Sequence, residues 1–257
     1  MARRTTTLFS AVLVLGIPAA ASGDNDHGRG PRLKADPFVF VGKAGDCGEG
    51  TPAGSNIVTA AWLGGAGLPD NGGQNPSADR RDRHRGLLLS KNGPTTDCSA
   101  AGAEIKGVKG MVVGANFELG YDYRNGGHCG AGAPRFNVSY TLQGGGDAFS
   151  FVGGCSNDST PTPAPQDTAQ WSRVRFQTSN PAESFPVIPA GSRIKSINLI
   201  FDEGTDTPTA ARPSGDAGNP AGIGLSVVDN IFINGEVIRS GKGVEPKGGE
   251  EGRDDDD

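Results

Sequence analysis

The feature that most constrains the fold is a pair of alternating runs between Met111 and Leu142. Apolar side chains occupy every second position from Met111 to Tyr123, and again from Phe136 to Leu142. A period of two places one set of side chains on a core and the other in water, as in a half-buried β-strand. The segment between the runs, 125–132, is rich in glycine, which permits tight turns. We therefore expect two neighbouring strands that share one polar face.

The rest of the chain favours the same class. It contains 42 Gly and 18 Pro, and only 35 % of its residues are apolar. No segment has apolar residues at helical spacing over three turns, so we predict an all-β fold. Asn234-Gly235 between two apolar runs predicts a hairpin. About ten strands can be expected in total, and an antiparallel β-sandwich, of jelly-roll type, is the natural closure.

The two ends of the chain have the composition of a signal peptide and of disordered segments. Arg3 and Arg4, the apolar stretch 8–17 and the small residues 19–21 predict a signal peptide over 1–21. Residues 22–35 and 240–257 are rich in charge and glycine and predict a disordered arm and a disordered acidic tail. This leaves 36–239 as a single sandwich domain. We expect a secreted protein, extracellular or periplasmic, without a membrane anchor.

Four cysteines in an exported chain favour two disulfides over free thiols. Three pairings are possible. We prefer Cys129–Cys155, because both cysteines follow strands near the alternating runs, and then Cys47–Cys98 by elimination. A zinc site is the alternative, but no two cysteines approach the C-x-x-C spacing.

The charge of the chain bears on its partners. Its 24 basic and 29 acidic side chains give a net charge of −5, which becomes −7 when Arg3 and Arg4 leave with the signal peptide. An acidic balance argues against nucleic acid as a partner.

The segment Val228–Ile233 resembles the last strand of secreted bacterial jelly-roll modules, including carbohydrate-binding modules and galactose-binding-like domains. In those families a carboxylate at this place often helps to hold a structural calcium, which implicates Asp229 here. The segment 129–138 is similar to a segment of uncharacterised exported bacterial proteins, from which no function transfers.

Calcium prefers six to eight oxygen ligands, and a long acidic loop can supply them. The candidates beside Asp229 are Asp202, Glu203, Asp206 and Asp216. The alternative is that these acids form turns in solvent, and their spacing fits no EF-hand.

A sugar site needs an aromatic ring for stacking and planar polar groups beside it. Trp171 with Arg173 and Arg175 offers this combination on the strand face opposite Val174 and Phe176. The polar face of the alternating runs would extend the site with Asn116, Glu118, Asp122, Arg135 and Asn137. The alternative is that Trp171 covers a sheet edge and the arginines pair with acids.

Signatures of enzymes are weak. There is no G-x-S-x-G, and the three histidines lack metal-binding spacing. Ser192 and Lys195 match S-x-x-K, but they enter a predicted strand where a helix is required. We expect an exported, non-catalytic binding or surface-associated module whose leading ligand is an extracellular polysaccharide or glycan. The alternatives are a jelly-roll polysaccharide hydrolase and a purely structural protein.

Overall fold

The computed structural model describes residues 32–55, 57–70, 84–158, 160–206, 223–239 and 241. The predicted signal peptide 1–21, most of the predicted arm 22–35, Asp216 and nearly all of the predicted tail 240–257 lie outside these residues.

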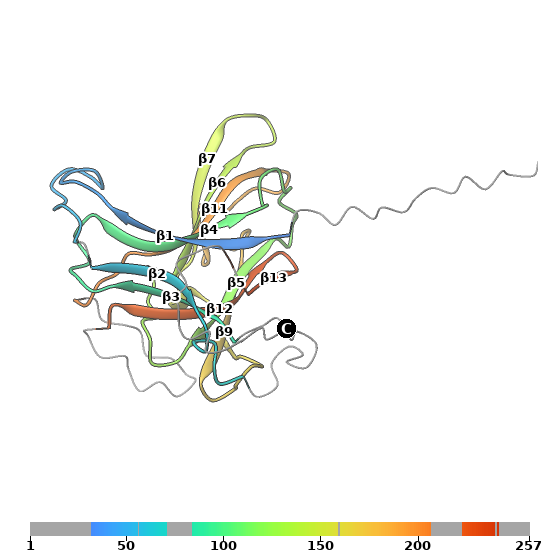
Figure 1. Cartoon of the computed structure of the whole chain (residues 1–257). Helices are drawn as coiled ribbons and strands as arrows, with labels where there is room; N and C mark the ends of the chain where they lie inside the picture. Colours follow the sequence, from blue (N-terminus) through green and yellow to red (C-terminus); the bar gives the residue numbers. More distant parts are fainter. Residues whose placement is uncertain are drawn as a thin grey trace, which may run out of the picture. The chain divides into compact units, whose positions relative to one another are not determined.

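Two antiparallel sheets pack against each other, with β1 and β4 above β2, β3 and β12 in Figure 1. The six-stranded sheet has the order β1 (Lys34–Val41), β4 (Ser99–Lys106), β11 (Arg193–Phe201), β6 (Arg135–Thr141), β7 (Asp147–Gly153) and β10 (Ser184–Phe185). The seven-stranded sheet has the order β2 (Val58–Leu63), β3 (Gly86–Lys91), β12 (Leu225–Ile233), β5 (Glu118–Arg124), β9 (Trp171–Gln177) and β8 (Thr162–Pro163), with β13 (Glu236–Ile238) paired to β12.

The predicted all-β sandwich is confirmed. Among the described residues the one helical element is a short 3-10 turn, Cys155–Asn157. No helix in these ranges has the length and apolarity to cross a membrane. The jelly-roll connectivity remains a prediction.

The core lies between the inner faces of the two sheets. Phe136, Val138 and Leu199 enter it from the six-stranded sheet, and Tyr121 and Phe176 enter from the other; all five are buried. The Tyr121 ring lies 5.9 Å from that of Phe136 and 6.0 Å from that of Phe176. Its hydroxyl donates a hydrogen bond to the Pro134 carbonyl at 2.7 Å, so the polar end of the ring is satisfied inside the core.

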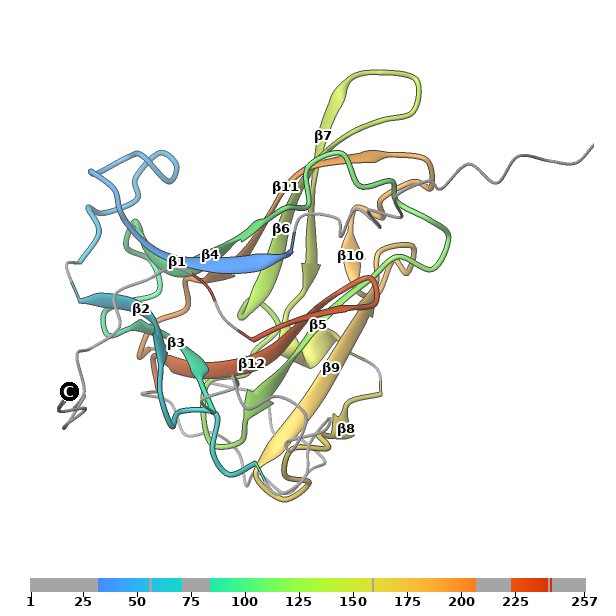
Figure 2. The same cartoon turned by 45° about the vertical axis from the view of Figure 1, so that its right-hand side comes forward.

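The two alternating runs lie in different sheets, and this corrects the expectation that they are neighbours. The first run gives β5 and the second gives β6, and the segment 125–134 crosses from one sheet to the other (Figure 2). The first strand also begins at Glu118 rather than at Met111. Alternation predicts a strand and its two faces, but it does not specify which strand lies beside it.

The boundaries of other elements agree with local sequence signals. β11 has alternating apolar residues, with Ile197, Leu199 and Phe201 buried, and the turn between β12 and β13 has positive φ at Asn234 (45°) and Gly235 (100°). This is the backbone that favours Asn-Gly in hairpins. At the N-terminal end, however, β1 begins at Lys34, so the predicted arm 22–35 is two residues too long. Ala35 is buried, and its carbonyl accepts a hydrogen bond from Trp62 Nε1 at 2.8 Å.

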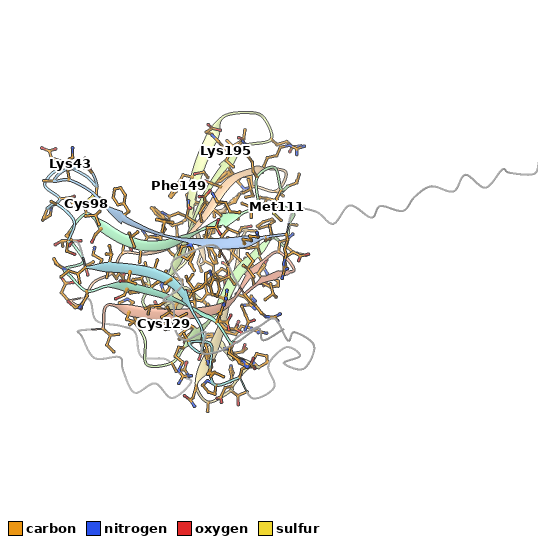
Figure 3. All side chains as sticks on the ribbon, viewed as in Figure 1. Lys43, Cys98, Met111, Cys129, Phe149 and Lys195 are labelled. Carbon is orange, nitrogen blue, oxygen red and sulfur yellow. A yellow bond between two sulfur atoms is a disulfide. The ribbon has the colours of Figure 1, made fainter. Side chains whose placement is uncertain are left out.

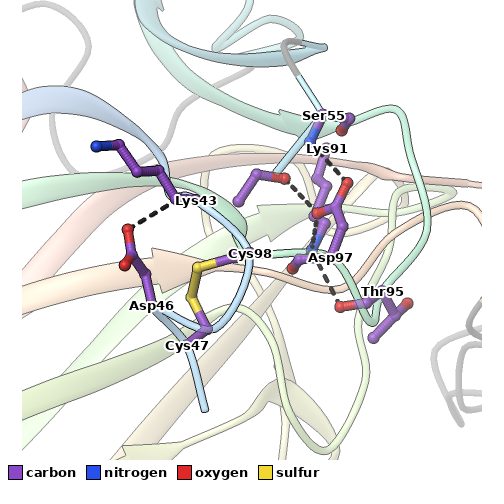
Figure 4. Close-up of a disulfide and its surroundings, with 9 residues drawn as sticks. Lys43, Asp46, Cys47, Ser55, Lys91, Thr95, Asp97 and Cys98 are labelled. Carbon is purple, nitrogen blue, oxygen red and sulfur yellow. Dashed lines mark hydrogen bonds and ion pairs between the residues drawn. A yellow bond between two sulfur atoms is a disulfide. The ribbon is translucent and has the colours of Figure 1, made fainter. Parts of the chain in front are cut away.

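Both preferred disulfides are confirmed. Cys47 and Cys98 have a Cα–Cα distance of 5.4 Å, and Cys129 and Cys155 one of 5.2 Å. The first bond, shown in Figure 4, ties the loop after β1 to the start of β4. The second ties the crossing segment 125–134 to the 3-10 turn after β7.

Candidate functional site

The predicted sugar-stacking residue Trp171 does not offer an open ring. Its exposed fraction is 0 %, and the Arg124 guanidinium lies over its ring at 5.6 Å. A sugar cannot stack on a ring that is fully buried, so the prediction of Trp171 as a stacking platform disagrees with the structure. Sequence alternation assigned Trp171 to the outer face of β9 correctly, but it could not show that other residues cover that face.

Arg173 and Arg175, predicted to bind sugar beside Trp171, instead contact the carboxylate of Asp122. Arg173 donates to both carboxylate oxygens, at 2.7 and 2.9 Å, and Arg175 Nη1 lies 3.7 Å from Oδ1. Burial lowers the pKa of Arg175 to about 10, although the charge of Asp122 acts in the opposite direction. The Arg175 guanidinium also lies 4.6 Å from the Phe232 ring.

The network around Asp122 continues into a loop. Asn230 Nδ2 donates to Asp122 Oδ2 at 3.1 Å and to Gln166 Oε1 at 2.6 Å. Gln166 Nε2 donates in turn to the Gly67 carbonyl at 3.1 Å. These polar groups bond one another, and a buried network that is satisfied in this way makes its surroundings rigid. We interpret this face of the seven-stranded sheet as structural.

Among the described residues, the acids predicted to bind calcium each have a different partner. Asp202 pairs with Arg135, and Glu203 bonds His128 Nε2. The Asp206 carboxylate accepts bonds from the hydroxyl and the amide of Thr95, which lower the pKa of Asp206. Asp229 accepts a bond from the amide of Asn230 at 2.6 Å. Within the described ranges no group of three or more His, Cys, Asp or Glu could hold a metal ion, and calcium stays a prediction.

Exposed aromatic rings occur instead on the outer face of the six-stranded sheet. Phe149, Phe151 and Phe185 have exposed fractions of 43 %, 42 % and 43 %. Phe185 lies directly opposite Phe151 in the pairing of β10 with β7, so these two rings share one face. The rings of Phe149 and Phe151 meet edge to face, with centroids 4.9 Å apart. Figure 3 shows Phe149 on the side of β7 turned away from the second sheet.

Planar polar side chains stand beside these rings on the neighbouring strand β6. Asn137 lies opposite Phe151 in the strand pairing. The Arg135 guanidinium lies 5.1 Å from the Phe151 ring, and Asp202 holds it through two bonds of 2.6 Å. We call these five residues the aromatic face: Arg135, Asn137, Phe149, Phe151 and Phe185.

The aromatic face has the chemistry that was expected around Trp171. An exposed ring can stack on the apolar side of a sugar, and amide and guanidinium groups can bond its hydroxyls. Arg135 and Asn137 were predicted to extend a sugar site, whereas Glu118 and Asp122, predicted with them, lie in the other sheet. The alternation of β7 shows that Phe149 and Phe151 share a face, but not that this face is the open one.

Comparison with known protein families, with curated proteins and with solved structures finds no match to this chain.

Proposed function

We propose that the protein is an exported, non-catalytic module that binds extracellular polysaccharide through the aromatic face. The observation that carries the proposal is the set of three half-exposed phenylalanine rings on one sheet face. A contiguous exposed apolar patch that is rimmed by polar groups often marks a binding site on a soluble protein. The adjacent Asn137 and Arg135 supply the polar contacts that orient a sugar over such rings.

Two features support export. The N-terminal sequence has the three parts of a secretory signal peptide. Both cysteine pairs form disulfides, and disulfides persist in oxidising compartments outside the cytosol.

The test is electrophoresis of the full chain in native gels that contain a soluble polysaccharide. We expect the polymer to slow the protein, and the double variant Phe149→Ala/Phe151→Ala to lose at least tenfold in affinity. A matched control, Ile57→Ala/Val112→Ala, removes two exposed apolar side chains elsewhere (exposed fractions 58 % and 50 %) and should bind as the parent does. Equal binding by the parent and the phenylalanine variant would overturn the aromatic face as the site.

Two further measurements test for hydrolysis and for bound calcium. Release of reducing sugar from the polymer would establish a hydrolase, and we expect none. Repeating the gels with a chelator tests the calcium prediction, because a bound structural ion would make binding or thermal stability depend on calcium.

A further inference from the structure

A second pair of phenylalanine rings lies on the outer surface of the six-stranded sheet, near its opposite edge. Phe38 and Phe40 belong to β1, and Phe40 has an exposed fraction of 45 %. Phe38 lies opposite Gly102 of β4. Gly102 lies opposite Ile200 of β11, and Ile200 lies opposite Arg135 of β6. Residues directly opposite each other in paired strands point to the same side, so these two rings share the outer surface with the aromatic face.

The Phe38 ring lies over the sheet rather than beyond its edge. A Cβ added to Gly102 would lie 2.6 Å from Phe38 Cζ and 2.9 Å from Phe38 Cε1. The ring therefore rests on the backbone of β4, where the glycine leaves room for it. Phe40 lies two residues farther along the same side of β1. We call Phe38 and Phe40 the β1 subsite.

The surface between the β1 subsite and the aromatic face is polar. Asn198 of β11 lies opposite Asn137 of β6 on one side and opposite Glu104 of β4 on the other. Glu104 pairs with Lys106, and both of these side chains have an exposed fraction of 47 %. A surface with aromatic rings at both ends and polar groups between them fits a sugar polymer, because each sugar unit has an apolar side and a set of hydroxyl groups.

The two groups of rings are too far apart for a short sugar. Three strands, β4, β11 and β6, separate β1 from β7 (Figure 2). Neighbouring strands in a sheet lie about 4.8 Å apart, so the four spacings from β1 to β7 amount to about 19 Å. A disaccharide cannot contact rings at both ends of this span, whereas a hexasaccharide can.

The twist of the sheet favours a flexible ligand. Each strand of a sheet is rotated relative to its neighbour. As a result, β1 runs across the view in Figure 1 while β7 runs up it. The outer surface therefore turns between the two groups of rings. A single polysaccharide chain can follow this turn, but the flat surface of a crystalline polysaccharide cannot contact both ends.

We infer that the ligand is a single polysaccharide chain that crosses the strands of the six-stranded sheet, from the aromatic face to the β1 subsite. Phe40 then determines specificity for chain length, because only a chain that covers the strands in between reaches its ring. This inference rests on the proposed function and specifies its ligand.

The experiment compares two chain lengths of one sugar on the full chain. The native gels contain hydroxyethyl cellulose, arabinoxylan, galactomannan or glycol chitin. A disaccharide and a hexasaccharide from the backbone of the polymer that slows the protein are then titrated by calorimetry. We expect the hexasaccharide to bind at least tenfold more tightly than the disaccharide. We expect no retention of the protein on microcrystalline cellulose.

Three variants test the β1 subsite. Phe40→Ala removes the exposed ring, so it should weaken binding of the hexasaccharide about tenfold and leave binding of the disaccharide unchanged. Phe40→Trp keeps a ring at this position and should bind the hexasaccharide at least as tightly as the parent does. Val39→Ala is the matched control, because Val39 is the next residue on β1, has an exposed fraction of 52 % and points to the other side of the sheet. It should bind both sugars as the parent does.

The outcomes separate the two claims. If no polymer slows the protein, the proposed function fails and this inference fails with it. The inference alone is overturned if a polymer binds through Phe149 and Phe151 but the disaccharide binds as tightly as the hexasaccharide. It is also overturned if Phe40→Ala binds the hexasaccharide as the parent does, if Phe40→Ala and Val39→Ala lose affinity equally, or if microcrystalline cellulose retains the protein.

Discussion

Asp97 occupies a loop between β3 and β4, where it meets the fully buried Lys91 (Figure 4). Its Oδ1 lies 3.0 Å from Lys91 Nζ, and its carboxylate accepts bonds from Ser99 Oγ at 2.5 Å and from the Ser55 amide at 2.9 Å. The Lys91 ammonium also donates to the carbonyls of Thr95 and Asp97, both at 3.0 Å. Burial of Asp97 opposes its ionisation, but the bonds from Ser99, Lys91 and Ser55 outweigh burial and hold its pKa well below the usual range.

This pair predicts a specific dependence of stability on pH. A carboxyl group with a lowered pKa in the folded state stabilises the fold above the unfolded pKa, near 3.8, and loses this contribution as the pH falls further. Asp97→Asn should therefore lower the free energy of unfolding at pH 7 by about 3 kcal/mol, because it leaves the Lys91 charge buried without its partner. Urea unfolding at pH 7 and pH 3 measures the difference, which should shrink at pH 3.

The control is Asp46→Asn in the neighbouring loop, whose carboxylate accepts an exposed bond from the Lys43 amide at 2.8 Å. It should change stability by less than about 0.5 kcal/mol. A loss of stability of similar size in both variants would show that the buried Lys91–Asp97 pair stabilises the fold no more than the exposed bond of Asp46 does.

The sequence does not reveal which aromatic rings are open to solvent. Trp171 is the larger ring and lies beside two arginines, so it was the natural candidate for sugar stacking. Phe149 and Phe151 are two residues apart on β7, as Trp171 and Arg173 are on β9. The two phenylalanine rings are open to solvent, however, and Trp171 is not. The side chain of Arg124, from the neighbouring strand β5, lies over the Trp171 ring, and no pattern within β9 reveals this contact.

The segment that crosses between the sheets, 125–134, is held by contacts that sequence patterns do not reveal. His128 is buried, with Nε2 bonded to Glu203 and Nδ1 lying 3.2 Å from the Ile223 carbonyl. At Gly154 the backbone has φ of +85°, and an added Cβ would lie 1.7 Å from the Ala131 carbonyl oxygen. Only glycine fits this close approach of the 3-10 turn to the crossing segment.

Gly154→Ala should therefore destabilise the protein by at least 2 kcal/mol, roughly the cost of an unfavourable φ together with a backbone clash. The reason is that the backbone of the crossing segment must move, and the disulfide Cys129–Cys155 joins the same two segments. Urea unfolding monitored by tryptophan fluorescence measures the change.

Gly144→Ala is the matched control, since nothing lies within 4 Å of its added Cβ and its φ is ordinary. We expect it to unfold at the same urea concentration as the parent or slightly above it. Equal stability of the two variants would contradict the close packing of Gly154.

The elements themselves were largely predictable. β11 and the β12–β13 hairpin follow from alternation and from Asn-Gly, which are local signals. The pairing of β5 with β12 and β9, and of β6 with β11 and β7, was not predictable. Both strands present one apolar face, so local pattern cannot show which sheet each one joins.

For the whole molecule, two disulfides close loops of different length. Cys47 and Cys98 are 51 residues apart in sequence, and Cys129 and Cys155 are 26 apart. Loop-closure entropy then predicts that replacing the first pair by alanine costs about 4 kcal/mol and replacing the second about 3.5 kcal/mol. Urea unfolding of the two double variants measures both losses, and a variant as stable as the parent would show that its disulfide does not restrict the unfolded chain.

A separate experiment tests whether the chain is exported. Expression with the natural N-terminus in a bacterial host should yield protein outside the cytosol whose N-terminal sequence begins at Ser22. Protein that stays in the cytosol and begins at residue 1 or 2 would contradict the proposed export.

An NMR titration of the ¹⁵N-labelled protein with an oligosaccharide from a polymer that slows it in the gels tests most directly whether the aromatic face binds sugar. Binding at the aromatic face predicts that amide shifts concentrate on Arg135–Asn137, Phe149–Phe151 and Phe185, with little change in β9. Shifts that centre on Trp171 and Arg173, or saturating ligand without any shift on the aromatic face, would contradict it.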